Sequence, residues 1–263
     1  MTIPELQPRP GSFANYPSLK DRVVLVTGGG SGIGASVVTA FAGQGAKVAF
    51  VDIDVEASEK LAASLAGMEH RPVFIRCDLT DIDALRATIA RIRAEIGPIG
   101  VLINNAANDS RHAIADVTPE SWDRAMNANL KHQFFAAQAV HPHMRELGHG
   151  SIVNFSSTAW MYGGADFVGY STAKAAVIGL TNALAREFGK DEIRVNAVAP
   201  GAVATERQLR LWYTKEQANA FVSRQLLHHW LLADELARTT LFLAADDSRM
   251  ITKQLLIVDA GLR

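Results

Sequence analysis

Cysteine, long apolar runs and an excess of charge of one sign are scarce or missing in this sequence of 263 residues. Its one cysteine, Cys77, cannot form an internal disulfide, which fits a reducing compartment. No stretch approaches the ~20 consecutive apolar residues that span a bilayer, and the N-terminus lacks the basic and apolar regions of a secretion signal. The formal net charge of −1 gives no reason to expect nucleic acid or a membrane surface as a partner. We therefore expect a cytoplasmic protein that binds neither.

Proline is concentrated at the start of the chain, where four of the nine prolines lie within the first 17 residues. Proline resists both helix and central strand, so residues 1–18 are expected to form an extended arm. This arm is either a frayed tail or a segment that docks on a neighbouring subunit. The composition shows no later break, so residues 19–263 are expected to fold as a single domain.

Apolar, β-branched runs recur along the chain and alternate with segments of helical character. The run Val23–Thr27 is typical of a strand that is buried on both faces. Further strands are expected at residues 47–51, 73–76, 101–103, 151–155, 194–198 and 254–258. Thr118 as cap and Pro119 in the first turn predict a long helix that runs to about Leu147. This alternation predicts an α/β fold with one doubly wound parallel sheet and helices on both faces.

A glycine-rich turn follows the first predicted strand directly and opens a helix. Glycines let backbone N–H groups approach a pyrophosphate, and the N-terminus of the helix carries partial positive charge. The spacing Gly28-x-x-x-Gly32-x-Gly34 differs from the common G-x-G-x-x-G, and glycine clusters alone are often only turns. The strand–turn–helix context nevertheless favours a dinucleotide site. Its expected residues are Gly28, Ser31, Gly32, Ile33 and Gly34.

Acidic residues end the second and third predicted strands. Asp52 can accept hydrogen bonds from both hydroxyls of an adenosine ribose and would repel a 2′-phosphate. No arginine or lysine lies in the glycine turn or just after Asp52 to bind such a phosphate. These features favour NAD over NADP. Asp54 is better explained as the N-cap of a helix that begins near Val55. Asp78 has two equal interpretations, a hydrogen bond to the adenine amino group or the cap of a turn.

Tyr170 and Lys174 are four residues apart and share one face of a predicted helix, thirteen residues after Ser157. A phenol normally titrates near pH ~10, so tyrosine is a poor base at neutral pH. An ammonium ~4 Å away contributes roughly 4 kcal/mol at an effective dielectric of ~20, which corresponds to roughly three pKa units. Such a tyrosine could exchange a proton with an alcohol. Alone, the pair more often marks a packed or solvated helix face.

The glycine turn, the segment 104–106, Asn129, Ser157, Tyr170 and Lys174 occur in the order that is characteristic of one family. From about Val23 to Gly261 the chain resembles the short-chain dehydrogenases/reductases, which implies a Rossmann-type fold. The resemblance implies that Tyr170 takes a hydroxyl proton, Lys174 lowers its pKa and holds the nicotinamide ribose, and Ser157 bonds the reacting oxygen. It also implies that Asn129 holds a water that links the lysine to solvent. Without the other three residues, simple packing inside a helix would explain Asn129 better.

Further cofactor contacts are expected along the carboxyl ends of the strands. Small residues after the fourth strand let a ring or a ribose lie against the backbone, and the segment 200–205 resembles the family's nicotinamide side. The cofactor residues expected here are Asp78, Leu79, Asn105, Ala106, Ala107, Pro200, Gly201, Val203 and Thr205, together with Tyr170 and Lys174. Two departures from the family pattern, Ala107 for glycine and Asp259-Ala260-Gly261 for Asp-Gly-Gly, are expected to change only local packing.

A closer resemblance lies in segments 108–112 and 205–208 together with Trp212-Tyr213. These look like the bacterial NAD-dependent aldose dehydrogenases that act on xylose, arabinose, fucose and similar sugars. This branch implies oxidation at the anomeric carbon to a lactone, and the family implies a homotetramer. The residues expected to contact the sugar are Asn108, Asp109, Arg111, Ser157, Trp160, Tyr170 and Arg207. Apart from Ser157 and Tyr170, each is individually more often a surface or loop residue.

Two other functions fit the same motifs. The scaffold could act on another alcohol or ketone, such as a steroid, an acyl group or a small polyol. A nucleotide-binding regulator that has lost catalysis is a third alternative, although it would not need an intact Ser157, Tyr170 and Lys174. The histidine pairs 141/143 and 228/229 lack a carboxylate or cysteine at metal-ligand spacing, so no metal site is expected.

Overall fold

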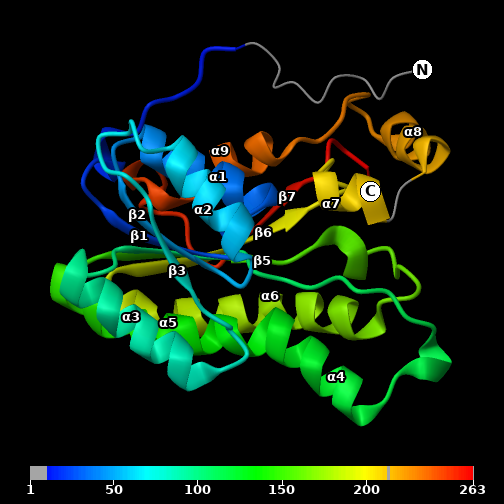
Figure 1. Ribbon diagram of the computed structural model, residues 1–263, viewed down its shortest axis with the longest axis horizontal. Helices are drawn as coiled ribbons and strands as arrows, with labels where there is room; N and C mark the ends of the chain where they lie inside the picture. The colour runs from blue at the N-terminus through cyan, green and yellow to red at the C-terminus, as the bar shows by residue number, and fades with distance from the viewer. Residues whose placement is uncertain (1–10, 212–213, 263) are drawn as a thin grey trace.

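The computed structural model describes residues 11–211 and 214–262. Its centre is a seven-stranded parallel sheet in the order β3-β2-β1-β4-β5-β6-β7 (Figure 1). The strands are β1 (Val23–Thr27), β2 (Lys47–Asp52), β3 (Val73–Arg76), β4 (Val101–Asn104), β5 (Gly150–Phe155), β6 (Ile193–Pro200) and β7 (Leu255–Val258). All seven lie within a residue or two of the predicted strands.

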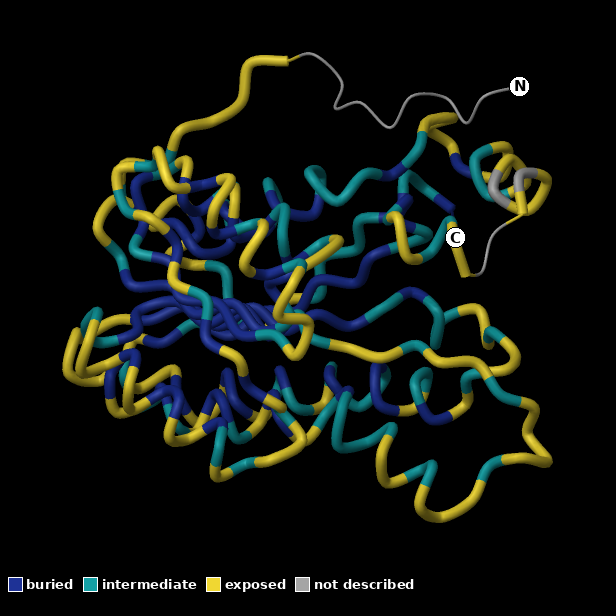
Figure 2. The backbone as a smooth tube through the Cα atoms, in the orientation of Figure 1, coloured by how far each residue is buried: buried dark blue, intermediate teal, exposed yellow. Residues whose placement is uncertain are grey.

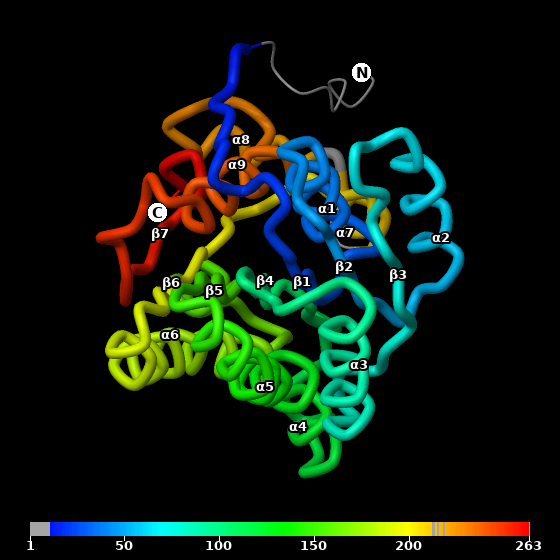
Figure 3. The backbone as a smooth tube through the Cα atoms, turned by 90° about the vertical axis from the view of Figure 1, so that its left-hand side faces the viewer, coloured from blue at the N-terminus to red at the C-terminus, as the bar shows by residue number. Residues whose placement is uncertain are grey.

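Helices cover both faces of the sheet (Figures 1 and 3). One layer contains α1 (Gly32–Gly43), α2 (Val55–Ser64) and α9 (Ala233–Ala244), and the other contains α3 (Ile82–Glu95), α5 (His132–Leu147) and α6 (Val168–Phe188). Successive side chains of β1 point to opposite faces of the sheet and pack in two separate hydrophobic cores. Val24 and Val26 pack on the side of α1, while Val23 and Leu25 pack on the side of α3. The strands are accordingly the most deeply buried part of the chain (Figure 2). The predicted doubly wound α/β fold is confirmed.

The predicted long helix that leads to Leu147 is wrong in one respect. Thr118 caps it as expected, but regular α4 (Pro119–Met126) passes into a π-helical turn at Asn127–Lys131 before α5 begins. The turn contains Asn129, whose side-chain amide bonds both to Ala125 one turn back and to the chain outside the helix. Helix propensity carries no information about such an external bond. π-turns occur frequently at functional sites.

The described part of the N-terminal arm lies on its own chain. The Arg238 guanidinium of α9 lies over the Phe13 ring, and the Tyr16 N–H donates to Gln44 Oε1 at 2.7 Å. Leu19 is fully buried. Residues 1–10 lie outside the described residues, so the division into an arm and one domain stays a prediction.

Residues between β6 and α9 form an excursion from the sheet. It contains two helices, α7 (Glu206–Leu211) and α8 (Lys215–Arg224), and its base is closed where the Ala204 N–H donates to the Leu231 carbonyl at 2.9 Å. Trp212 and Tyr213, which carry part of the closer family resemblance, lie outside the described residues. Within the described ranges, no helix is both long and apolar enough to cross a membrane.

Candidate active site

The predicted site residues gather at the carboxyl ends of the central strands. β1 pairs with β2 on one side and with β4 on the other, so the strand order reverses at β1. Ligands of open α/β sheets bind in the crevice that such a reversal creates. The glycine turn follows β1 and the Asn105–Asp109 segment follows β4, so both lie at this crevice.

Two glycines of the turn have no room for a side chain. Gly28 has φ of 65°, and a Cβ there would lie 2.7 Å from the Ala106 Cα. A Cβ on Gly34 would lie 1.8 Å from the Gly28 carbonyl oxygen. The turn is therefore a backbone cradle at the N-terminus of α1, of the kind that holds a pyrophosphate.

Hydrogen bonds of the Asn105 and Thr27 side chains hold the glycine turn in place. The Asn105 side chain donates to the carbonyls of Thr27 and Gly28 at 3.1 and 2.9 Å. The Thr27 hydroxyl accepts from the N–H groups of Asn105 and Ala106. The predicted cofactor segment after β4 thus holds the glycine turn directly, while Ala107 beside it is exposed.

Asp52 lies at the end of β2 with its carboxylate against the turn. One oxygen accepts from the Gly30 N–H at 2.9 Å, and the other accepts from the N–H groups of Ile53 and Asp54. Asp54 caps α2 by accepting from the Ala57 N–H at 3.1 Å, as its spacing predicted. Hydrogen bonds from backbone N–H groups therefore hold the Asp52 carboxylate in one orientation.

Asp78 is exposed, and its carboxylate accepts from both the N–H and the hydroxyl of Thr80. These bonds hold its pKa below the usual range. The turn-capping alternative is thus observed in the structure. Leu79, which follows it, is half-buried against the core beneath α3.

Lys174 is buried in α6, with 1% of its surface exposed. Its Nζ donates to the Phe155 carbonyl at the end of β5 at 2.7 Å and lies 5.7 Å from the centroid of the Tyr170 ring. Burial lowers the pKa of Lys174 to about 7, against an opposing effect of the Asp109 carboxylate. The structure therefore places the predicted tyrosine and lysine together, with the lysine beneath the ring.

Ser157 lies two residues beyond the end of β5. Its hydroxyl oxygen accepts from the Ala159 N–H at 3.1 Å and so caps the short turn Thr158–Trp160. The neighbouring Ser156 donates to the Lys174 carbonyl and accepts from the Trp160 indole. These contacts tie the end of β5 to α6, so Ser157 and Tyr170 belong to one rigid corner.

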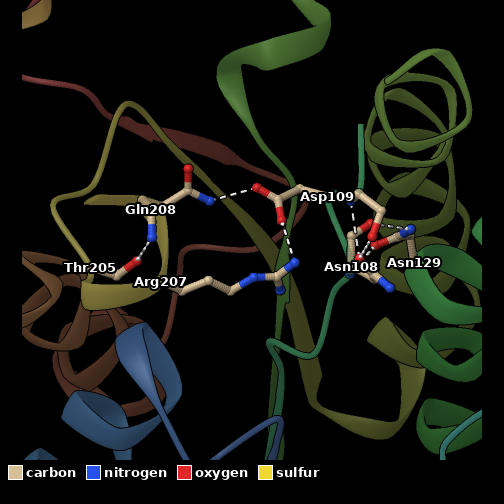
Figure 4. A network of polar contacts seen from close by, with 7 residues as sticks. Asn108, Asp109, Asn129, Thr205, Arg207 and Gln208 are labelled. Atoms are coloured by element: carbon tan, nitrogen blue, oxygen red, sulfur yellow. Dashed lines mark hydrogen bonds and ion pairs between the residues drawn. The ribbon is translucent and has the colours of Figure 1, made fainter. Parts of the chain in front are cut away.

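Asn129 is fully buried, and its side-chain amide forms hydrogen bonds with backbone groups of other residues. Its Oδ1 accepts from the Asn108 N–H at 2.8 Å, and its Nδ2 donates to the carbonyls of Asn108 and Ala125 (Figure 4). Its main-chain carbonyl accepts from Gln133 Nε2 at 3.2 Å. A water at Asn129 would therefore bind the second lone pair of this carbonyl.

Two of the predicted sugar contacts, Asp109 and Arg207, lie against each other. One Asp109 oxygen is 3.2 Å from an Arg207 nitrogen, and the other accepts from Gln208 at 2.5 Å (Figure 4). Arg111 instead lies 5.6 Å over the Phe167 ring, which in turn packs edge-on against Tyr170. All three predicted polar residues therefore lie around the same corner.

Comparison with known proteins agrees with this geometry. Residues 28–263 match the family model described as enoyl-(acyl carrier protein) reductase. Over all 263 residues the chain is 50% identical to a full-length protein of Rhizobium meliloti (strain 1021) provisionally assigned as a galactose dehydrogenase. The chain belongs to the short-chain dehydrogenase/reductase family.

Other members of this family are similar over almost the whole chain. The D-xylose 1-dehydrogenase of Caulobacter vibrioides is 48% identical over 252 residues, which cover 96% of this chain and all of the relative. A crystal structure assigned as a gluconate dehydrogenase from Agrobacterium tumefaciens has a TM-score of 0.89 and 26% identity, covering 95% of this chain and 98% of its own. The predicted resemblance to the family and to its sugar dehydrogenase branch is confirmed. As a short-chain dehydrogenase/reductase, the protein is an oxidoreductase that uses a nicotinamide cofactor on a small-molecule substrate.

The segment expected at the nicotinamide side of the family lies at the end of β6. The Pro200 carbonyl accepts from the Thr158 hydroxyl, and the Gly201 N–H donates to the Val258 carbonyl. Val203 and Thr205 follow toward α7. Of the two departures from the family pattern, Ala260 has φ of 55°, a conformation that costs roughly 1–2 kcal/mol for residues other than glycine.

Sequence reasoning missed His132, which follows the π-turn and is fully buried. Its Nε2 lies 3.2 Å from the Ala106 carbonyl. Burial, reinforced by the charge of Lys174, lowers the pKa of His132 to about 4, so the ring is neutral at physiological pH. Nothing in the local sequence distinguishes His132 from its exposed neighbour Lys131. Gln133 and Gln208 were missed for the same reason.

The histidines that sequence analysis singled out lie away from this corner. His141 pairs with Asp191 at 2.8 Å and stacks on Phe188, a carboxylate partner that spacing alone did not show. Across the part of the chain that the structure describes, no group of three or more His, Cys, Asp or Glu residues is placed to hold a metal ion.

Proposed function

We propose that the protein is an NAD-dependent aldose 1-dehydrogenase, which oxidises the anomeric carbon of a sugar and releases the lactone. One observation carries this proposal: the buried Lys174 amine lies 5.7 Å from the Tyr170 ring, and the Asp109 carboxylate, which pairs with Arg207 of α7, acts on this lysine from the loop that follows β4. The identities to a galactose dehydrogenase and a D-xylose 1-dehydrogenase support a sugar as the substrate.

The glycine turn supports dinucleotide binding, because Gly28 and Gly34 leave no room for a Cβ and the turn opens α1, whose N-terminus favours a pyrophosphate. The residues proposed to hold the cofactor are Gly28, Ser31, Gly32, Ile33, Gly34, Asp52, Asp78, Leu79, Asn105, Ala106, Ala107, Tyr170, Lys174, Pro200, Gly201, Val203 and Thr205. When bound, the nicotinamide accepts a hydride from the carbon that is oxidised. Asp52 favours NAD, since its oriented carboxylate would accept ribose hydroxyls and repel a 2′-phosphate.

The proton chemistry rests on Tyr170. As a phenolate it takes the proton of the sugar hydroxyl, while the Ser157 hydroxyl donates to the reacting oxygen and stabilises its developing charge. A lysine with a pKa of about 7 is protonated in part of the molecules at neutral pH. Lys174 can therefore favour the phenolate when charged. The charged form can release a proton toward solvent, and the neutral amine that results can accept the next proton from the site. Asn129 would hold the next water through its carbonyl.

The sugar is proposed to lie among Asn108, Asp109, Arg111, Trp160 and Arg207. A carboxylate has about four lone-pair sites and a guanidinium has five N–H donors. Asp109 and Arg207 can thus bond sugar hydroxyls while they remain paired with each other. The Trp160 ring offers an apolar face, because its indole N–H is already bonded to Ser156.

A substrate panel tests this proposal. We expect the purified protein with NAD to form NADH with at least one pentose, 6-deoxyhexose or hexose, and Tyr170→Phe to form none at a comparable rate. Turnover of steroids, ketones or acyl substrates without turnover of any aldose would overturn the sugar assignment and leave the family chemistry intact. A homotetramer, a cytoplasmic location and the absence of a metal stay predictions.

A further inference from the structure

Helix α7 (Glu206–Leu211) lies next to the candidate site and has no fully buried side chain; Gln208 and Leu209 are half-buried and its other residues are exposed. Leu211, an apolar residue, is 47% exposed. Helices in proteins are usually held by burial of an apolar face. Leu209 is the one apolar residue of α7 that is even half-buried, so the position of this helix depends largely on its polar contacts.

Those contacts converge on one carboxylate from a distant part of the chain. Arg207 and Gln208 lie next to each other in α7, and each approaches a different oxygen of Asp109 (Figure 4). The side chain of Asp109 is only 22% exposed. Partial burial and two donors make this contact stronger than an isolated surface ion pair.

The Asp109 end of the contact is rigid. Both the N–H and the carbonyl of Asn108 bond to the buried side chain of Asn129, and Asn108 Oδ1 accepts from Ser110. The Asp109 carboxylate also lies near enough to the reacting corner to oppose the effect of burial on the pKa of Lys174. The loop that carries Asp109 is therefore part of the site's own framework.

The same N-terminal end of α7 lies near the cofactor turn. Thr205 accepts from the Gln208 N–H and sits so close to Gly32 that a Cβ there would be 3.4 Å from the Thr205 methyl group. Just before it, the bond from Ala204 to Leu231 closes the base of the excursion. Thr205 and the first turn of α7 thus connect the glycine turn with the loop that follows β4.

We propose that Asp109, Arg207 and Gln208 form a latch that positions α7 across the site and releases it for exchange of sugar and cofactor. Gln208 acts as a positioning residue, while Asp109 and Arg207 position α7 in addition to their proposed contacts with the sugar. The latch deepens the proposed function, on which it rests for the identity of the ligands, but its existence does not depend on a sugar.

Hydrogen exchange in the full-length protein without sugar tests the latch directly. Amides of residues 207–211 are expected to exchange roughly 5- to 30-fold faster in Asp109→Ala, Arg207→Met and Gln208→Leu than in the wild type. The matched control is Arg210→Met, which removes the same charge from the same helix without touching Asp109. Wild-type exchange in the three variants, or equal acceleration in the control, would overturn the proposal.

Charge reversal distinguishes a specific pair from general loosening. Asp109→Arg and Arg207→Asp are each expected to accelerate exchange, and the double variant is expected to recover at least part of the protection. A double variant that exchanges as fast as the faster single variant would contradict a direct pair.

Kinetics test whether the latch serves the reaction. Gln208→Leu, which removes no proposed sugar ligand, should raise the KM for the sugar roughly threefold to tenfold while kcat stays within about twofold. An unchanged KM would overturn the functional role of the latch. If the wild type oxidised no sugar, the proposed function would fail while the exchange comparison still decided whether the latch exists.

Discussion

Lys174 is the residue at which stability and chemistry conflict. A lysine that is 1% exposed loses hydration, and burial lowers its pKa to about 7. The backbone carbonyl of Phe155 accepts a hydrogen bond from the Lys174 amine. A purely structural position would be filled better by an apolar side chain, so the buried amine beneath Tyr170 is best explained by proton transfer.

Tyr170→Phe removes the phenol and leaves the ring packing against Phe167. We expect the turnover of the sugar to fall by about 10²- to 10⁴-fold, the usual contribution of a positioned acid–base group. NAD should bind with nearly unchanged affinity, measured by titration of the purified variant. Substantial remaining turnover would contradict the role of Tyr170 as the base.

Asp52→Ala removes the carboxylate that faces the glycine turn. We expect weaker binding of NAD and a smaller advantage of NAD over NADP, measured as the ratio of kcat/KM for the two cofactors. Asp54→Ala is the matched control, because it removes a helix cap, costs about 1 kcal/mol of stability and leaves that ratio unchanged. An unchanged ratio in Asp52→Ala would mean that Asp52 does not select the cofactor.

At the scale of elements, the strands and most helices follow from local pattern, while the π-turn does not. Runs such as Val23–Thr27 predict buried strands, and capping residues predict where helices begin. The turn at Asn127–Lys131 depends on a bond from Asn129 to Asn108, which lies outside the helix. The local sequence around a helix does not show which distant residue will hydrogen-bond to it.

The buried ring of His132 gives this region a dependence on pH. In the folded protein its pKa is about 4, against an ordinary value of 6.5, so the unfolded chain binds a proton at a higher pH than the folded chain. Stability is therefore lost as the pH falls from about 6.5 toward 4. The loss from this group is at most ~1.4 kcal/mol per pH unit and about 3 kcal/mol in total.

His132→Gln keeps a donor for the Ala106 carbonyl but does not titrate. We expect urea unfolding at pH 7 and pH 4.5 to show a smaller loss of stability in this variant than in the wild type. His228→Gln, at an exposed histidine, should keep the wild-type loss. Equal losses in all three proteins would refute the assignment of His132 as a buried neutral ring.

At the scale of the whole molecule, the sheet order brings distant segments to one crevice. Residue types and their order singled out Asp52, Ser157, Tyr170 and Lys174, whose roles stay predictions. The pairing of Asp109 with Gln208, 99 residues later, could not be predicted, because it depends on how the β4 loop and α7 meet in space. The same limit hid His132 and the bond of Asp52 to the glycine turn.

The strands and helices of the framework carry the residues proposed for the family's chemistry. The loop that follows β4 and the segment that contains α7 carry the residues proposed to select the substrate. The protein's membership of the short-chain dehydrogenases/reductases rests on nearly the whole chain. The sugar assignment rests on the β4 loop and α7, which carry the polar side chains around Tyr170. The central claim is therefore that the carbon oxidised is the anomeric carbon of an aldose.

Isotope transfer from that carbon tests the claim most directly. The protein is incubated with NAD and D-galactose or D-xylose that carries deuterium at C1, and the NADH and the sugar product are analysed by mass spectrometry and NMR. We predict NADH that contains the deuterium, together with the corresponding lactone. Unlabelled NADH, a ketone formed at another carbon, or no reaction with either sugar would contradict the account.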